Sequence, residues 1–137
     1  MRRYALRVAV FIVACVAPPA SAHHSFAQFD QTKVLYAAGT VTDFEWVNPH
    51  TWLHLDLVAA NGAVARWTFE GGSPEQLAMQ GWKPELFHRG DKVAVGFRPM
   101  KDGSHSGQLM SVKFVNGQHV CSNAGCSDGA GGTLARF

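Results

Sequence analysis

The sequence predicts a small all-β domain with one short helix. Trp52 to Val58 alternates apolar and polar residues, which places Leu53, Leu55 and Leu57 on one buried face of a strand. Several other runs of similar length share this pattern, and pairs that contain glycine or proline separate them. A single helix start, Ser73-Pro74, interrupts the strands. Together with a length of 137 residues, these features predict one domain with a modest core.

The first half of the chain predicts three antiparallel strands joined by tight turns. β-Branched and aromatic residues fill the strands, while Asn48-Pro49 and Asn61-Gly62 have the composition of turns. Gly39 permits a bend or a bulge in the first strand. The first expected strand consists of residues 33–38 and Val41–Val47 on either side of Gly39, and the other two are Trp52–Val58 and Val64–Glu70. We therefore expect the fold to begin with three neighbouring strands.

One short helix and two further strands follow. Ser73 is a favoured N-cap, Pro74 fits the first helical position, and Gly81 ends the helix. The next strands are expected at Lys92–Arg98 and Gln108–Val115. The element order is thus strand, strand, strand, helix, strand, strand.

This order is that of an OB-type barrel, in which a five-stranded sheet closes on itself and the helix covers one end. Closure also hides the two sheet edges, which would otherwise expose unpaired backbone groups. A split sandwich with one helix would give a similar order and is the alternative. We therefore predict a single OB-like five-stranded barrel in residues 23–120, written β-β-β-α-β-β.

Residues 1–22 have the features of a cleavable export signal. Three arginines precede the short apolar segment Val8–Ala17, and Pro18-Pro19 separates this segment from the small residues Ala20-Ser21-Ala22. The alternative is lipid attachment at Cys15, because Ile12 to Cys15 resembles a lipobox. Both interpretations predict export, and cleavage after residue 22 predicts a periplasmic protein.

Composition argues against two classes of partner. An apolar segment of about ten residues is too short to span a bilayer, which needs roughly 20. Three of the 12 basic residues and none of the 10 acidic ones lie in the signal, so nine basic and ten acidic residues remain and the net charge is −1 with histidine neutral. No basic stripe is left for nucleic acid. The expected partner is a metal ion, a small ligand or another periplasmic protein.

Cys121 and Cys126 are the two cysteines that follow the signal. In an oxidising compartment the Cys-Ser-Asn-Ala-Gly-Cys loop is expected to close as a disulfide, because Asn and Gly permit the tight turn. A thiolate metal pair is the alternative, but the Gly-rich tail offers few further ligands. Residues 121–137 are therefore predicted to form a disulfide loop and a flexible tail.

Several short motifs occur together across residues 23–120. They are HHSFA at 23–27, GTV at 39–41, FEW at 44–46, NPH at 48–50, GW at 81–82 and KDG at 101–103. In this combination the chain resembles a family of small exported bacterial proteins of unknown function. The resemblance implies export and brings no activity or ligand with it.

Four histidines form a candidate metal site. His23, the first residue after cleavage, would carry a free α-amine and an imidazole that chelate a transition metal together. His24 offers the amine, the intervening amide and its own ring instead. His50, in the first hairpin turn, and His54, two pleats further on, are candidates for another imidazole. Because such a nitrogen-rich site suits copper better than zinc, copper binding is the leading hypothesis.

A metal-free binding module is the competing hypothesis. Trp46 and Trp52 lie near His50 in the sequence and are candidates for a stacking surface that recognises a small molecule, a polymer or a protein partner. Trp67 and Trp82 are expected in the core instead. The histidines also have ordinary roles under this hypothesis, since His54, for example, can pair with Asp56 or another neighbour.

Catalysis has weaker support than binding. The sequence contains no Ser/His/Asp arrangement, no phosphate-binding glycine loop and no dinucleotide fingerprint. Four carboxylates lie on expected strands, where outward acids are usually solvated: Asp43, Glu45, Asp56 and Glu70. We therefore expect a binding protein rather than an enzyme.

Overall fold

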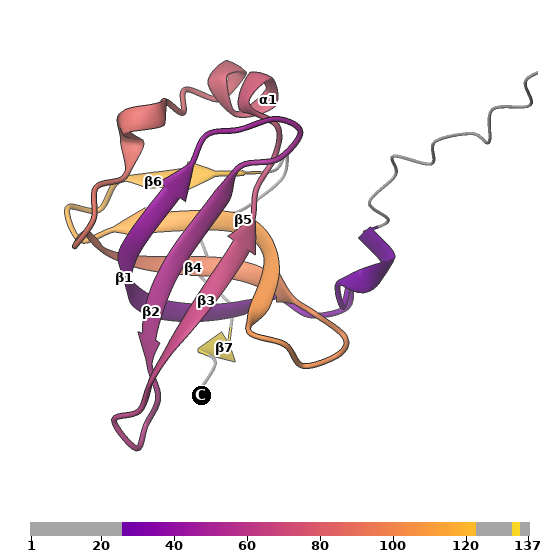
Figure 1. Cartoon of the computed structure of the whole chain (residues 1–137), viewed down its shortest axis with the longest axis vertical. Coiled ribbons are helices and arrows are strands. Elements are labelled where there is room, and N and C mark those ends of the chain that lie inside the picture. The colour runs from indigo at the N-terminus through magenta and orange to yellow at the C-terminus, as the bar shows by residue number, and fades with distance from the viewer. Residues whose placement is uncertain (1–25, 123–132, 135–137) are drawn as a thin grey trace, which may run out of the picture.

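The computed structural model describes residues 26–122 and 133–134. In this part the chain forms a small β-barrel with one short helix over one end (Figure 1). In chain order the elements are η1 (Phe26–Gln28), β1 (Leu35–Glu45), β2 (Trp52–Val58), β3 (Val64–Glu70), α1 (Pro74–Met79), η2 (Pro84–Leu86), β4 (Lys92–Pro99), β5 (Ser106–Phe114), β6 (His119–Cys121) and β7 (Thr133–Leu134). The order of strands and helix agrees with the prediction.

The barrel closes through the strand order β1-β2-β3-β5-β4, with β4 returning to β1. Neighbouring strands of this ring are antiparallel except β3 and β5, which run parallel over three residue pairs. β1 serves two neighbours, because its first half pairs with β4 and its second half with β2. The predicted OB-like five-stranded barrel is confirmed, and the split sandwich is excluded.

Alternating strand residues fill the interior of the barrel. The three leucines of β2 are buried, as the sequence pattern predicted, and alternate residues of β4 share the interior with them. All six are at most 4% exposed: Leu53, Leu55, Leu57, Val93, Val95 and Phe97. In β3, Trp67 and Phe69 stack with their ring centroids 6.0 Å apart. Burial of these apolar side chains is the main stabilising term of the domain.

The helix α1 is held over the barrel end by its cap and by one buried side chain. Ser73 Oγ accepts a hydrogen bond from Gln76 N at 3.2 Å, and Ser73 N donates to Gln76 Oε1 at 3.3 Å. This reciprocal capping box satisfies two backbone donors at the helix start. Leu77 is fully buried, and Gly81 ends the helix with φ +87°. The predicted cap, proline and stop are therefore confirmed.

β1 is one continuous strand with its bulge later than expected. The register shifts between Val41 and Asp43, whereas the sequence analysis placed a bend or bulge at Gly39. Gly39 has another role, because a Cβ there would lie 2.4 Å from Leu57 Cδ2 and 2.9 Å from the Asp56 carbonyl oxygen. The glycine permits close approach of β1 to β2.

The chain after β5 adds two short strands to the barrel. β6 pairs with β5, and β7 pairs parallel with Leu35 and Tyr36 of β1. Thr133–Leu134 thus pairs with the sheet although the sequence predicted a flexible tail. Cys126 lies outside the described residues, so the predicted Cys121–Cys126 disulfide remains a prediction.

The segment before β1 is fixed along the end of β4. Phe29 is 2% exposed, and its neighbour Asp30 donates a backbone hydrogen bond to the Pro99 carbonyl oxygen at 2.8 Å. On the other side, Lys101 N donates to the Gln28 carbonyl oxygen at 3.0 Å. Phe29 is thus docked on the barrel, while Phe26 remains 57% exposed. The barrel therefore holds the chain firmly from residue 28 onward.

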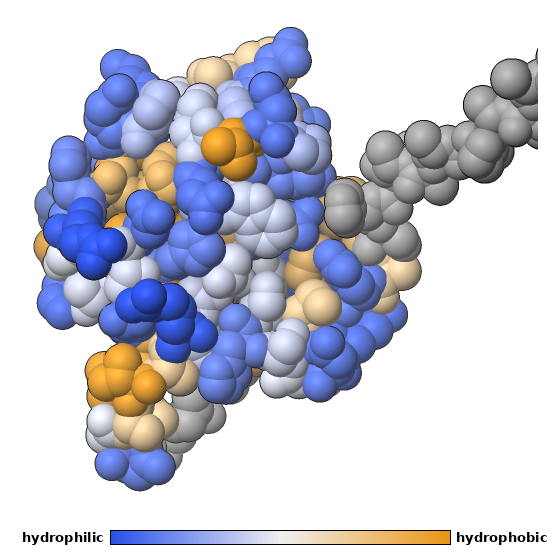
Figure 2. Space-filling model, in the orientation of Figure 1, coloured by the Kyte–Doolittle hydropathy of each residue, from blue (hydrophilic) through white to orange (hydrophobic). Residues whose placement is uncertain are grey.

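One apolar patch of the surface lies on the hairpin between β2 and β3. In Figure 2 this hairpin projects from the barrel as an orange area beside hydrophilic residues. Val58 and Val64 pair in register there, and each is 64% exposed. The end of β2 is thus solvated although the leucines before it are buried.

Two substitutions in β2 test the alternation. Leu55→Ala, at a fully buried site, is expected to lower the free energy of unfolding by about 2–5 kcal/mol, because it removes apolar contacts and leaves a cavity. Val58→Ala, at the exposed end, is expected to change it by about 0.5 kcal/mol or less. Urea unfolding measures both. Similar losses in the two variants would contradict the assigned faces.

Asp30 makes stability depend on pH. Hydrogen bonds from the Lys33 side chain at 2.7 Å, and from Thr32, hold the pKa of this carboxyl well below its usual range. A depressed folded pKa stabilises the fold above the unfolded pKa of about 3.9, and this contribution is lost as pH falls below that value. Asp30→Asn is therefore expected to lower the urea midpoint at pH 7. At pH 2 to 3 the difference from the unsubstituted protein should shrink, and a constant difference would refute the assignment.

Candidate functional site

The two barrel histidines line different pockets. His50 precedes β2 and lines a pocket of about 280 Å³ together with Phe26 and Gln108. His54 lies in the middle of β2 and lines a pocket of about 250 Å³ that includes Glu45. By sequence, either ring is a candidate for the barrel ligand. The structure separates them, so each must be judged by its own surroundings.

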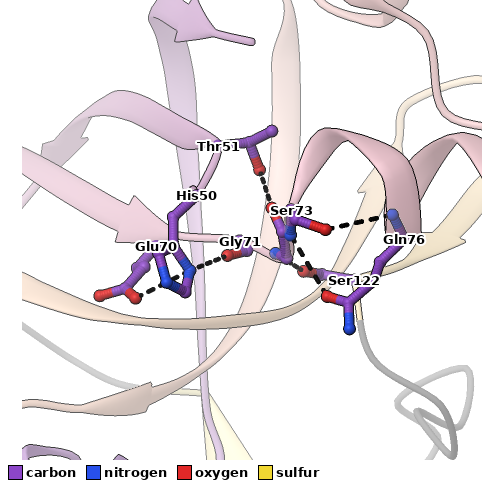
Figure 3. Close-up of polar contacts among 8 residues, drawn as sticks. His50, Thr51, Glu70, Gly71, Ser73, Gln76 and Ser122 are labelled. Carbon is purple, nitrogen blue, oxygen red and sulfur yellow. Dashed lines mark hydrogen bonds and ion pairs between the residues drawn. The ribbon is translucent and has the colours of Figure 1, made fainter. Parts of the chain in front are cut away.

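His50 is oriented by a buried carboxylate. Glu70 Oε1 lies 3.1 Å from His50 Nδ1, and the Gly71 carbonyl oxygen lies 3.3 Å from the same nitrogen (Figure 3). Because both oxygens are acceptors, Nδ1 carries a proton and donates it. In the neutral ring the lone pair then lies on Nε2. This is the nitrogen that binds metal in carboxylate–histidine–metal arrangements.

Gly71 and Gly72 bring the end of β3 against the residue that follows His50. Thr51 N and Thr51 Oγ1 each donate to the Gly72 carbonyl oxygen at 3.0 Å, and Gly71 N donates to the Thr51 carbonyl oxygen at 2.8 Å. A Cβ on Gly71 would lie 2.4 Å from Thr51 Oγ1, so glycine is required. Gly72 N also donates to Ser122 Oγ at 3.2 Å. This pair, which the sequence indicates only as a strand break, holds His50 beside Glu70.

The N-terminal side of the described chain meets the His50 pocket. Phe26 lines this pocket and is absent from the lining of the His54 pocket. Residue 23 precedes Phe26 by three residues, which an extended chain spans in at most about 11 Å. His23 and His24 themselves lie outside the described residues. The predicted mature terminus is therefore at most about 11 Å of extended chain from Phe26, a residue that lines the His50 pocket.

His54 has polar partners at both ring nitrogens. Its Nε2 lies 2.8 Å from Glu45 Oε1, and its Nδ1 lies 3.0 Å from Thr68 Oγ1. A metal at either nitrogen would displace one of these contacts. Asp56 bonds to Arg66 at 3.0 Å instead, and this hydrogen bond raises the pKa of the guanidinium. His54 thus links β1, β2 and β3 in the way expected of a structural residue.

The four tryptophans differ in burial. Trp67 and Trp82 are 6% and 2% exposed, as the sequence predicted. Trp46 is half-buried and packs against the core, with its ring centroid 5.9 Å from that of Phe44. Trp52 is half-buried on β2, opposite Glu70. Ligand binding by Trp46 and Trp52 remains a prediction.

Residues 26–122 and 133–134 contain no group of three or more His, Cys, Asp or Glu side chains arranged to hold a metal. Cys121 ends β6, and its carbonyl oxygen accepts a hydrogen bond from Trp82 Nε1 at 3.0 Å.

In residues 26–122 and 133–134, no helix has the length and apolar character needed to cross a membrane.

Glu70 and Gln108 are site residues whose role the sequence pattern did not reveal. Strand acids were expected to be solvated, but Glu70 is 7% exposed. It is the last residue of β3 and pairs in register with Gln108 of β5. The only sequence feature that marks Glu70 is its position directly before Gly71-Gly72, where the strand ends. Glu70 is buried because β3 pairs in parallel with β5, and the sequence contains no pattern that predicts this pairing.

Substitution of Gly71 tests how the site is built. Gly71→Ala is expected to lower the free energy of unfolding by about 1–3 kcal/mol, because the added methyl overlaps Thr51 Oγ1. Gly72→Ala is the matched control, since its Cβ would meet its nearest atom at 3.3 Å and should cost less. Urea unfolding compares the two. Equal losses of stability in the two variants would show that overlap with Thr51 Oγ1 is not what excludes alanine at position 71.

The sequence pattern described as "Family of unknown function (DUF6152)" matches residues 9–110, which is more than half of the chain. No curated protein and no solved structure matches the chain. The match agrees with the resemblance noted from the motifs, and export remains a prediction. The chain belongs to this family of unknown function.

Proposed function

We propose that this is an exported periplasmic protein that binds copper between its mature N-terminus and His50. The donors are the α-amine and imidazole of His23, with His24 as the alternative, and Nε2 of His50. The observation that carries the proposal is that Phe26 and His50 line the same pocket. His54, which the sequence offered equally, is assigned a structural role.

Reach is the first argument for this assignment. The chain is anchored at Gln28, Phe29 and Asp30, so only a short stretch separates the anchor from the predicted first residue. Five residues separate Gln28 from residue 23, and they span at most about 18 Å. A terminus tethered in this way has a high effective concentration at the pocket.

The orientation of His50 is the second argument. Glu70 and Gly71 both accept from Nδ1, and we assign Nε2 to the metal because this is the pattern of carboxylate–histidine–metal arrangements. A site with an amine and two imidazoles favours Cu(II) over Zn(II), because copper stands above zinc in the Irving–Williams order and accepts planar nitrogen sets.

Copper titration of the processed protein tests the proposal. With His23 confirmed as the first residue by mass, Cu(II) should bind at 1:1 stoichiometry. Acetylation of the His23 α-amine is expected to abolish tight binding, because the resulting amide nitrogen no longer offers the metal a lone pair. Equal uptake by the acetylated and native forms would remove the terminal amine from the site.

The two barrel histidines provide a matched pair. His50→Ala is expected to weaken Cu(II) binding more than the 10- to 100-fold that is typical for loss of a partner outside the ligand set, and Glu70→Gln by about that amount. His54→Ala should leave affinity unchanged while it lowers stability, since it removes two hydrogen bonds. The reverse ranking would assign the site to His54. If no form of the processed protein takes up copper, the metal-free module with Trp46 and Trp52 is the remaining candidate.

A further inference from the structure

The His50 pocket contains a buried acceptor that lacks a partner. Gln108 lines the pocket and is only 7% exposed. Its Oε1 has no hydrogen-bond partner in the part of the chain that the structure describes. An unpaired buried amide oxygen is costly, and such groups in folded proteins call for an explanation.

A buried negative charge beside the pocket favours a positive ligand. Glu70 pairs in register with Gln108, is itself 7% exposed and lies 3.1 Å from Nδ1 of His50, which lines the pocket. The described residues that line the pocket include no lysine and no arginine. An acceptor beside a buried negative charge is satisfied best by a cation that carries N–H or O–H groups.

We propose that this pocket binds a cation that donates hydrogen bonds, and that Gln108 Oε1 is the acceptor that selects it. Two sources share this chemistry: a metal ion with coordinated water or amine, and an organic ammonium. The inference rests on the proposed function for the metal, while the ammonium tests the pocket independently. The terminal amide torsion of glutamine is soft, so a modest rotation turns Oε1 toward the ligand.

Arg98 is the residue that must be distinguished from such a ligand. It faces Gln108 across β4 and β5, and its Nε is also buried without a partner among the described residues. Its guanidinium donates to Gln31 Oε1 of the segment before β1. If Arg98 satisfied Gln108 in solution, removal of the Gln108 amide would destabilise the protein.

The first experiment measures stability without ligand. Gln108→Leu removes the orphan oxygen at nearly constant volume, and the urea midpoint of the apo protein is expected to rise. Gln108→Glu keeps an acceptor in place and is the conservative comparison. A lower midpoint for Gln108→Leu would mean that Gln108 has an internal partner such as Arg98, and would overturn the proposal.

The second experiment measures binding with two probes. For Cu(II), Gln108→Leu is expected to weaken affinity about tenfold, the loss of one hydrogen bond to a charged group, whereas Gln108→Glu retains it. For the ammonium, methylammonium chloride should raise the thermal midpoint of the unsubstituted protein above that in tetramethylammonium chloride at equal ionic strength. Tetramethylammonium has the same charge and no N–H donor. The difference should vanish in Gln108→Leu.

The outcomes separate this inference from copper binding. If copper binds equally to the unsubstituted protein and to Gln108→Leu, the copper proposal stands and the role of Gln108 is wrong. If copper does not bind but methylammonium stabilises through Gln108, the pocket assignment stands and the copper proposal is wrong. The inference is overturned if Gln108→Leu changes neither the Cu(II) affinity nor the stabilisation by methylammonium. It is also overturned if neither Cu(II) nor methylammonium binds, in which case only water occupies the pocket.

Discussion

The parallel pairing of β3 with β5 is the contact on which the rest of the structure depends. It joins Thr68–Glu70 to Ser106–Gln108 and turns an open meander into a closed ring. Three residue pairs are few, but closure removes two sheet edges at once. The same pairing sets Glu70 beside Gln108 and buries both. The pairing of β3 with β5 therefore closes the barrel and also helps to form the His50 pocket. A substitution that separated these two strands would disrupt both.

The two histidines show how one strand gives similar residues different roles. His54 lies on the outer face of β2, where Glu45 and Thr68 on the neighbouring strands occupy both of its nitrogens. His50 lies just before the strand, where a buried carboxylate and a carbonyl oxygen share one nitrogen. Both nitrogens of His54 are therefore engaged in hydrogen bonds within the sheet. The contacts of His50 instead orient its ring at the wall of a pocket, as a binding residue requires.

Much of the fold was predictable because it is encoded locally. Leu53, Leu55 and Leu57 alternate with polar residues, and a period of two has one interpretation on a strand. Ser73, Pro74 and Gln76 specify the helix start by their own hydrogen bonds. The bulge after Val41 and the pairing of β7 were not predictable, since both depend on which segment lies alongside.

The amino-acid sequence alone established the strands, the helix and their order, and it identified His50 and His54 as equivalent candidates. The difference between these histidines emerged only when strands distant in sequence were brought together. Glu70 and Gln108 are 38 positions apart by number, and neither carries a local sign of burial. Hydrophobic alternation reports which face of a strand turns inward. It cannot report which neighbour a strand will have, and that neighbour determines whether a carboxylate is solvated or buried against a ring nitrogen.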